Sequence, residues 1–426
     1  MNPTIPVSLR QALHLIETNQ CTAEELLKAS LEQIEAREPE VGAWQCRLDT
    51  EACLTEYRSN RSFYENSLLK GLPVGIKDII DTADMPTEMG SPIHKGRQPV
   101  DDAACVALLR QAGGLIIGKT VTTEFAYFKP GKTANPRDLS RTPGGSSSGS
   151  AAAVADGMVP VALGSQTAAS VIRPAAYCGT VGYVGTRGEF SLRGIQPLGQ
   201  SLDSLGLFSR QVEDIELLRA VLLRQPAPLT STTPLAPRQV LFCRGDAAGE
   251  IDAEMVDAME RAAAILRAQG VDVIEPENSD WLGELVAHHG LIMAYEVARN
   301  LALESGHPDL LSPPLQDLIA AGLATSRSDY LASLQAVEQI REMLAQHYPD
   351  MDAILAPAAP GVAPKGHERT GAPHMSRPWQ AMGLPVVTLP GLTDKQGLPL
   401  GIQLAGAAYS DNELLRMARW LEPLLK

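Results

Sequence analysis

The sequence predicts an α/β protein, because short apolar runs alternate with helical patterns along most of its length. From about residue 70, runs such as LPVGIKDII and GLIIGKT are separated by Gly, Pro and Asp, and a helical stretch lies between them near 101–112. Towards the other end, DAILAPAAP, LPVVTLPGL and LPLGIQLAG are bounded by Pro and Gly, as buried strands often are. With 44% hydrophobic residues in a chain of 426, a large core is available.

The elements follow in order along the chain. Thr22 and Glu25 form a capping-box pattern, and apolar residues then recur at helical spacing, so we expect an amphipathic helix over 22–37. Residues 141–190 are rich in Gly, Ser and Ala, which favours close approach of backbone or ligand. A polar stretch rich in Pro and Thr at 223–237 predicts a surface connection.

Beyond this connection we expect a strand at QVLFC, a helix over 252–268 and further helices within 281–347. Four regions result. They are an N-terminal helical region packed on the core (1–66), a core that carries the chemistry (67–225), a helical or α/β subdomain that shapes the substrate pocket (226–350) and a return to the core sheet (351–426).

Composition excludes several classes of protein. The 36 basic residues are outnumbered by 50 acidic ones, and a formal charge of −14 argues against nucleic-acid binding and favours a small-molecule partner. The six cysteines form no CxxC pair and indicate reduced core residues. The first residues lack the pattern of a signal peptide, and no apolar stretch is long enough to span a membrane, so we expect a cytoplasmic protein.

The run GGLIIGKT at 113–120 satisfies the phosphate-loop pattern GxxxxGK[ST]. A phosphate loop needs small, flexible residues whose N–H groups converge on the ligand, whereas the variable positions here carry Leu and Ile. We therefore expect a buried strand rather than a nucleotide site.

Two serine-bearing runs of small residues are candidates for the chemistry. GGSSSGS at 144–150 is by itself typical of a linker, but its flanks NPRDLSRTP and AAAVA indicate a tight turn into a helix within a folded region. It contains Ser146. The second run, GSQTAASVIRPA, is turn-like from Gly164 onward and contains Ser170.

Neither serine has an obvious histidine base, since the eight histidines show no local nucleophile motif. A lysine can serve instead if burial lowers its pKa towards neutrality. Lys77 interrupts the apolar run LPVGIKDII and is such a lysine. Taken alone, its position favours a simpler interpretation, an edge lysine or a partner of Asp78.

Six segments together resemble the amidase signature family, in its order and approximate spacing. They are LPVGIKDIIDTADMPTEMGSP, AGGLIIGKTVTTEFA, NPRDLSRTPGGSSSGSAAAVADG, GSQTAASVIRPAAYCGTVGY, SLDSLGLFSRQVEDIELL and GLPLGIQLAG. The resemblance covers nearly the whole chain. It implies a central mixed β-sheet flanked by helices on both faces, and a serine amidase that needs no metal or cofactor.

The resemblance also implies a Ser-Ser-Lys triad, in which Lys77 is the base, Ser146 the bridging serine and Ser170 the nucleophile. The peptide bond before Ser146 is expected to be cis. The oxyanion hole is expected to consist of backbone N–H groups, those of Thr167, Ala168, Ala169 and Ser170.

The Ser-x-x-Arg form of the second run, with Gln-Thr ahead of it, looks most like malonamidase-type enzymes, and this likeness implies that Arg173 holds a substrate carboxylate. A guanidinium can grip a carboxylate with two hydrogen bonds. The alternative is that Arg173 pairs with a structural carboxylate of the protein.

The chain departs from the family pattern at three places. Ala168 and Ala169 stand where Gly-Gly is common, which matters only if the backbone there needs a positive φ. Gln166 replaces an Asp that many members carry, and this change is expected to alter a hydrogen bond beneath the loop. Val184 and Gly185 stand where Lys-Pro is frequent.

These observations predict an enzyme that hydrolyses the amide bond of a small carboxamide, with malonamate as a candidate, through an acyl-enzyme. One alternative is the A-type subunit of an amidotransferase, which releases ammonia from glutamine and works with partner chains. A second is a binding relic of low activity, suggested by the two alanines. The expected partner is a small-molecule amide, with neither nucleic acid nor membrane, and a homodimer is the candidate assembly.

Overall fold

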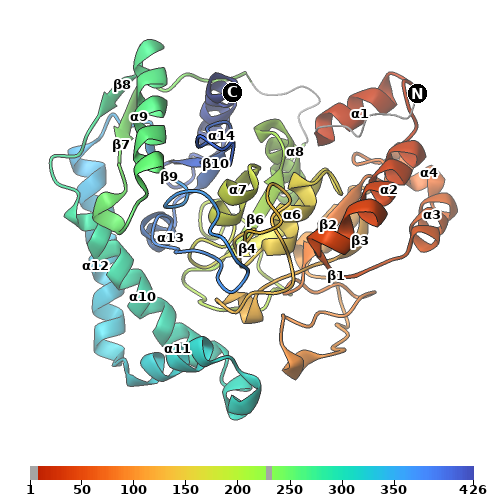
Figure 1. The fold of residues 1–426 in the computed structure, drawn as a ribbon, viewed down its shortest axis with the longest axis horizontal. Helices are drawn as coiled ribbons and strands as arrows, with labels where there is room; N and C mark the ends of the chain where they lie inside the picture. The colour runs from red at the N-terminus through yellow and green to blue at the C-terminus, as the bar shows by residue number, and fades with distance from the viewer. Residues whose placement is uncertain (1–7, 227–232) are drawn as a thin grey trace.

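The computed structural model describes residues 8–226 and 233–426. Part of the predicted connection at 223–237 therefore lies outside the described residues. Within the described ranges, eleven strands form one sheet (Figure 1). From one edge to the other they are β1 (Trp44–Arg47), β3 (Leu115–Thr120), β2 (Pro73–Lys77), β4 (Val161–Gln166), β6 (Ser204–Ser209), β5 (Val181–Val184), β10 (Val386–Leu389), β11 (Ile402–Ala405), β9 (Ala353–Pro357), β7 (Gln239–Phe242) and β8 (Asp272–Ile274).

The sheet is mixed. Strand β2 pairs in parallel with β3 and β4, and β7 pairs in parallel with β8 and β9, whereas the other neighbours are antiparallel. Each of the four regions expected from the sequence contributes at least one strand. The proposed region boundaries therefore fall within a single sheet.

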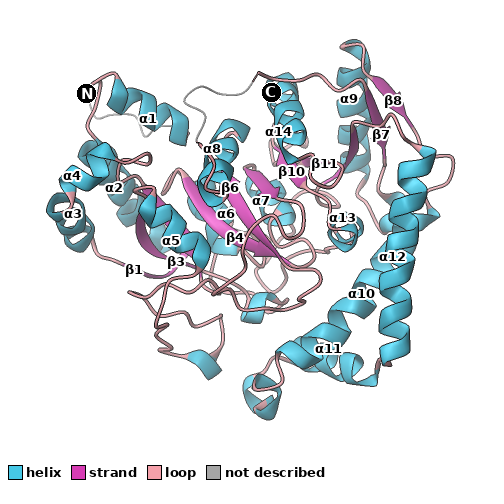
Figure 2. Ribbon diagram, turned by 180° about the vertical axis from the view of Figure 1, so that it is seen from behind, coloured by secondary structure: helices cyan, strands magenta, loops and turns pink. Residues whose placement is uncertain are grey.

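Helices cover this sheet on both faces, as opposite views show (Figures 1 and 2). Those of the described residues are α1 (Leu9–Glu17), α2 (Ala23–Val41), α3 (Thr50–Ser59), α4 (Arg61–Asn66), α5 (Ala104–Gln111), α6 (Ser148–Ala155), α7 (Ile172–Cys178), α8 (Val212–Leu222), α9 (Ala253–Ala268), α10 (Asp280–Asn300), α11 (Pro313–Ala324), α12 (Arg327–His347), α13 (Arg377–Met382) and α14 (Asp411–Leu421). Helix α6 packs on β2, β4 and β6, whereas α8 packs on β6, α5 and α14. The predicted α/β class with a central mixed sheet is confirmed.

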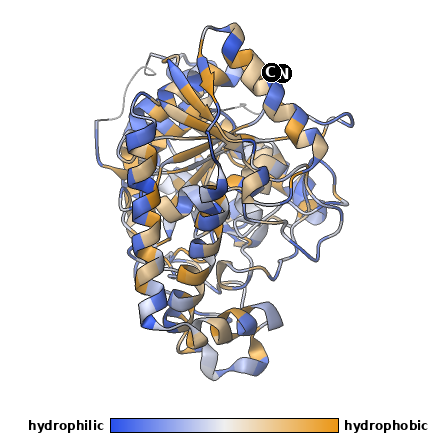
Figure 3. Cartoon of the chain, turned by 90° about the vertical axis from the view of Figure 1, so that its left-hand side faces the viewer, coloured by the Kyte–Doolittle hydropathy of each residue, from blue (hydrophilic) through white to orange (hydrophobic). Residues whose placement is uncertain are grey.

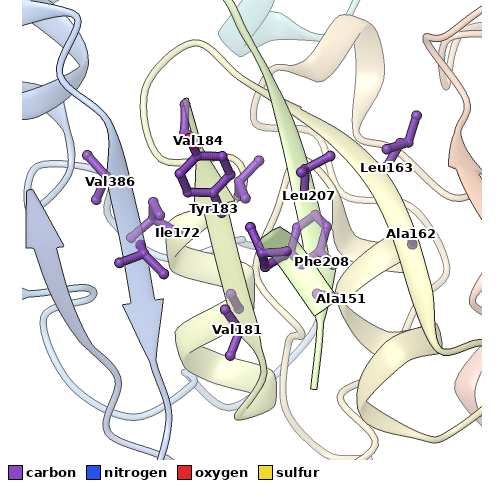
Figure 4. Packing of buried hydrophobic residues seen from close by; sticks show 14 of the residues in the cluster. Ala151, Ala162, Leu163, Ile172, Val181, Tyr183, Val184, Leu207, Phe208 and Val386 are labelled. Carbon is purple, nitrogen blue, oxygen red and sulfur yellow. The ribbon is translucent and has the colours of Figure 1, made fainter. Parts of the chain in front are cut away.

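The core lies between these layers. Every residue of β4, β5 and β6 is buried, because a strand covered on both faces has no polar side. Figure 4 shows Leu207, Phe208, Tyr183 and Val386 from neighbouring strands packed close together, with Ile172 of α7 between them. The ends of the neighbouring strands β2 and β4 lie next to the candidate site, since β2 ends at Lys77 and β4 leads into the turn with Ser170.

Local sequence signals account for most of the predicted elements. Helix α2 begins at Thr22, whose side chain accepts from the N–H of Glu25 in a complete capping box, but the helix runs to Val41, beyond the predicted end at 37. Gly42 ends it in the left-handed conformation, with φ at 61°. The GGLIIGKT run forms strand β3 with all six residues buried, as expected.

One expectation about the second serine run is wrong. Residues 164–166 are the end of strand β4 and not part of a turn, because Gly164, Ser165 and Gln166 pair with β6. The turn begins only at Thr167.

The helices α10, α11 and α12 form an arm beside the sheet, and Figure 3 looks onto this side of the molecule. Helix α12 buries Ser333, Val337, Ile340 and Leu344, which are spaced three or four residues apart on one face. Helix α10 contacts α11, α12 and α13. Met293 of α10 lines the cavity of the candidate site, so the arm borders this site on one side.

Candidate active site

Lys77 is the last residue of β2 and is completely buried. Its Nζ lies 2.6 Å from Ser146 Oγ, 2.9 Å from Ser165 Oγ and 3.4 Å from Ser165 O. The structure thus brings Lys77 and Ser146 together, as the family resemblance implies. Asp78 instead lies 3.4 Å from the buried Lys119, so the alternative role for Lys77 as its partner is wrong.

Burial lowers the pKa of Lys77 well below its usual value of 10.5, and the charge of Asp203 opposes this only in part. A neutral amine has two N–H donors and one lone pair. The carbonyl of Ser165 can only accept, so one N–H points to it, and the second N–H and the lone pair are then shared between the hydroxyls of Ser146 and Ser165, each of which can donate or accept. The geometry is compatible with proton transfer between the hydroxyl of Ser146 and the amine of Lys77.

Ser146 lies in a tight turn directly before α6, and the peptide bond between Gly145 and Ser146 is cis. Gly144 has φ at 82°, and a Cβ there would meet Pro174 Cα at 3.0 Å, so only glycine fits. The carbonyl of Ser146 accepts from the N–H of Thr123. The serines of this turn are buried, which contradicts a flexible linker.

Ser170 ends the turn that links β4 to α7. Among the described residues, the N–H groups of Ala168, Ala169 and Ser170 donate to no protein acceptor, and these residues line the same small cavity as Ser146. Free N–H groups beside a candidate nucleophile are the donors that an oxyanion needs.

The two alanines do not strain this turn. Neither Ala168 nor Ala169 is among the residues with a positive φ. A Cβ therefore costs no left-handed strain at either position. The departure from Gly-Gly leaves the turn with the backbone conformation that ordinary residues adopt.

Side chains beneath the turn fix its position. Gln166 Oε1 accepts from the N–H groups of Val171 and Ile172 at 3.0 and 3.1 Å, while its Nε2 donates to Gln380 Oε1 at 2.9 Å. The change from Asp to Gln at position 166 was expected to alter a hydrogen bond beneath the loop. In the structure, the side-chain amide of Gln166 donates to the side-chain amide of Gln380 in α13. Gln380 is buried and was not foreseen from the sequence.

Thr167 is held from two further directions. Its hydroxyl donates to Asp203 Oδ1 at 2.5 Å, and its carbonyl accepts from His289 Nε2 at 2.8 Å. Burial lowers the pKa of His289 to about 3, so the imidazole is neutral and carries its proton on Nε2. Within the described ranges, no histidine hydrogen-bonds to Ser146 or Ser170.

Ser146 and Ser170 line one cavity, but their hydroxyls form no hydrogen bond with each other in the part of the chain that the structure describes. They are linked through the backbone, since the N–H of Ser147 donates to the carbonyl of Ser170 at 3.2 Å. The cavity holds about 30 Å³. It therefore admits only a few atoms beside the two serines.

Arg173 is buried in α7 and also lines the cavity. Its Nη1 donates to Gly371 O at 2.5 Å, and its Nη2 donates to Gly145 O at 2.6 Å and Thr370 Oγ1 at 3.2 Å. No carboxylate among the described residues pairs with it, so the alternative of a structural ion pair is wrong. Burial lowers its pKa to about 10.

A larger cavity of about 1130 Å³ lies next to the small one and shares Phe128, Thr370 and Pro373 with it. Its wall is mostly apolar and includes six prolines from several separate segments. This outer cavity adjoins the small one at the three shared residues.

Two residues at the candidate site were not predicted from the sequence. Ser165 contacts Lys77 Nζ, and its only signal was a polar residue near the end of the apolar run that forms β4. Arg377, the first residue of α13, lines the cavity from the far end of the chain. Its only signal was a charged residue next to a proline and an aromatic residue.

Across the described residues, no helix is both long enough and apolar enough to cross a membrane.

Known proteins resemble this chain over almost its full length. The profile of the family described as "Amidase" matches residues 25–415. The A-type subunit of glutamyl-tRNA(Gln) amidotransferase from Anaeromyxobacter sp. strain K is 33% identical over 475 residues, which cover 98% of this chain and 96% of that protein.

Solved structures of amidases also resemble this chain. A crystal structure of an amidase superposes with a TM-score of 0.87 at 30% identity, covering 98% of this chain and all of that one. Native peptide amidase from Stenotrophomonas maltophilia gives a TM-score of 0.82 at 26% identity, covering 99% of this chain and 98% of that one. Because the matched segments and the fold agree along almost its whole length, this chain belongs to the amidase family, whose signature it carries.

Proposed function

We propose that this protein is a serine amidase that hydrolyses small carboxamides with Lys77, Ser146 and Ser170 as its triad. The observation that carries the proposal is the 2.6 Å contact between Lys77 Nζ and Ser146 Oγ, buried beside Ser170. A lysine with a lowered pKa accepts the proton that a serine must lose.

In the proposed reaction, Ser170 Oγ attacks the amide carbon and gives its proton to Ser146, which passes one to Lys77. The substrate must first bring the two hydroxyls within hydrogen-bond distance. The N–H groups of residues 167–170 stabilise the negative oxygen of the tetrahedral intermediate, a contribution of roughly 3–4 kcal/mol per donor in other hydrolases. The proton returns to the leaving amine, and water then cleaves the acyl-enzyme by the same path.

The substrate is proposed to be short, because the cavity at the serines is small. Arg173 contributes positive charge to its wall and keeps N–H groups beyond those that hold Gly145, Thr370 and Gly371. These features support an amide that bears a carboxylate, such as malonamate.

The test is ammonia release from a panel of carboxamides, compared between the intact chain and Ser170→Ala. The proposal expects turnover of at least one short amide and its loss in the variant. If both proteins released ammonia equally slowly from every amide, the chain would instead be a binding relic of the fold.

A second candidate function is supported by the amidotransferase subunits among the relatives. In that case the chain would release ammonia from glutamine and depend on partner chains. Glutamine belongs in the same panel for this reason. Preference for glutamine over all short carboxamides would favour the amidotransferase, and preference for a short amide in the isolated chain would favour the amidase.

A further inference from the structure

Arg377 places a second guanidinium on the wall of the catalytic cavity. It is half-buried, and burial lowers its pKa. Its Nε is shielded from solvent without a hydrogen-bond partner, and among the described residues it forms neither a hydrogen bond nor an ion pair. An unpaired guanidinium in such a place costs free energy unless something else pairs with it.

Other buried arginines of this chain do have partners. Arg187 donates to the carbonyls of Gln380 and Ala381, and Arg219 pairs with Glu189. Arg173 holds backbone carbonyls. Arg377 is therefore not explained by the same structural role.

The other residues of the cavity wall also favour binding of an anion. Among the described residues, no Asp or Glu lines it, and Arg377 and Arg173 are close enough for the charge of Arg377 to disfavour the charged form of Arg173. Two of the lining residues also carry buried polar atoms without hydrogen-bond partners among the described residues, Thr123 Oγ1 and Arg173 Nε. Two guanidiniums and unused donors around a few atoms of space match the oxygens of a carboxylate.

We infer that Arg377 is a specificity-determining residue that binds a carboxylate of the substrate while the amide carbon lies at Ser170. This inference rests on the proposed amidase function and deepens it. The substrate class is a short amide that ends in a carboxylate, held between Arg377 and Arg173. A neutral amide of the same size leaves both guanidiniums without an anionic partner.

Malonamate and malonamide form a matched pair of probes, because the second replaces the carboxylate of the first by a neutral carboxamide. We expect the intact enzyme to prefer malonamate. Arg377→Gln should lower kcat/KM for malonamate by about tenfold or more, mainly through KM, and leave malonamide nearly unchanged. Arg377→Lys should recover part of the preference, because it keeps the charge without the planar fork.

Arg341→Gln is the matched control, because it removes a half-buried arginine of α12 that does not line the cavity and pairs only with Glu338 among the described residues. It should leave the ratio between the two probes unaltered. Thermal unfolding of each variant checks that the fold is intact. Equal losses for malonamate and malonamide in Arg377→Gln would mean a structural role and would overturn the inference, while the amidase proposal would stand.

Binding of malonate to the Ser170→Ala protein provides a readout without turnover. Calorimetry should detect this binding, and adding Arg377→Gln should weaken it by about tenfold or more. If malonate bound equally with and without Arg377, the inference would fail even in an active enzyme. If no amide were hydrolysed but Arg377→Gln still abolished malonate binding, the amidase proposal would fail and the anion site would remain.

Discussion

Lys77 Nζ and Ser146 Oγ lie 2.6 Å apart, with the lysine completely shielded from solvent. No carboxylate hydrogen-bonds to this amine among the described residues; its other contacts are with Ser165. A buried lysine surrounded by hydroxyl and carbonyl groups is more stable as the neutral amine. This pair and the turn beside it therefore have measurable consequences for catalysis and for stability.

Replacing Lys77 by Met should lower kcat by about 10²–10⁴-fold, the usual contribution of a general base, with little change in KM. Methionine matches the length of the lysine stem but cannot accept a proton. Steady-state kinetics with the best amide of the panel measure the effect. Ser148→Ala is a control from the same turn, since among the described residues its hydroxyl donates only to the carbonyl of Ser146. Wild-type kcat in Lys77→Met would contradict the proton relay.

Activity should rise with pH as Lys77 loses its proton. Because burial lowers the pKa of Lys77, the rising limb of kcat/KM should lie well below pH 10.5. A pH profile measured on the intact enzyme checks this. A limb centred near 10.5 would show that Lys77 is not perturbed in the working enzyme.

Stability should depend on pH through the same residue. The unfolded chain holds a proton on Lys77 up to about pH 10.4, whereas the folded chain releases it at lower pH. The unfolded state thus binds more protons in this window, so the free energy of unfolding rises with pH and falls as pH drops towards the folded pKa. Urea unfolding at several pH values should show that Lys77→Met removes this part of the slope. An identical slope in both proteins would contradict the neutral amine.

Much of the fold could be predicted from the sequence, because local signals and burial agree there. The capping box at Thr22 and the apolar runs of β3 and β9 to β11 are such cases. The contact between Lys77 and Ser146 came from family resemblance, since two segments distant in sequence must meet in space. Gln380 and Arg377 could not be predicted, because α13 reaches the site only through the packing of the whole sheet.

Restoring glycine beside Ser170, the proposed nucleophile, should not raise activity. Neither Ala168 nor Ala169 has a positive φ, so Ala169→Gly removes no strain and gives the unfolded chain more freedom. We expect a loss of roughly 0.4–1 kcal/mol in unfolding free energy per substitution and no rise in kcat. Chemical denaturation and kinetics measure both. Ala407→Gly, on an exposed loop, controls for the general effect of glycine. A large gain in kcat would mean that the methyl groups hinder the oxyanion.

The hydrogen bond between the amides of Gln166 and Gln380 predicts that a carboxylate at position 166 destabilises the protein. In Gln166→Glu the carboxylate still accepts from Val171 and Ile172, but it now faces Gln380 Oε1 without a donor. Turning the amide of Gln380 would not help, because its Nε2 already donates to Gln166 O and Ser204 Oγ. We expect a loss of about 1–3 kcal/mol in unfolding free energy, and a lower kcat because the turn moves.

Two further measurements distinguish whether Gln166→Glu lowers the unfolding free energy through the lost hydrogen bond to Gln380 or through a general effect of the substitution. In Gln166→Glu, protonation of the introduced carboxylate would restore a donor towards Gln380, so the loss measured by urea unfolding should shrink as pH is lowered. It should also be smaller in a Gln380→Met background, where no amide oxygen opposes the carboxylate. A penalty that is constant with pH and unchanged in that background would show that the amide pair does not hold the turn. A smaller loss of unfolding free energy in both tests would instead show that the position of Ser170 depends on a hydrogen bond between strand β4 and helix α13.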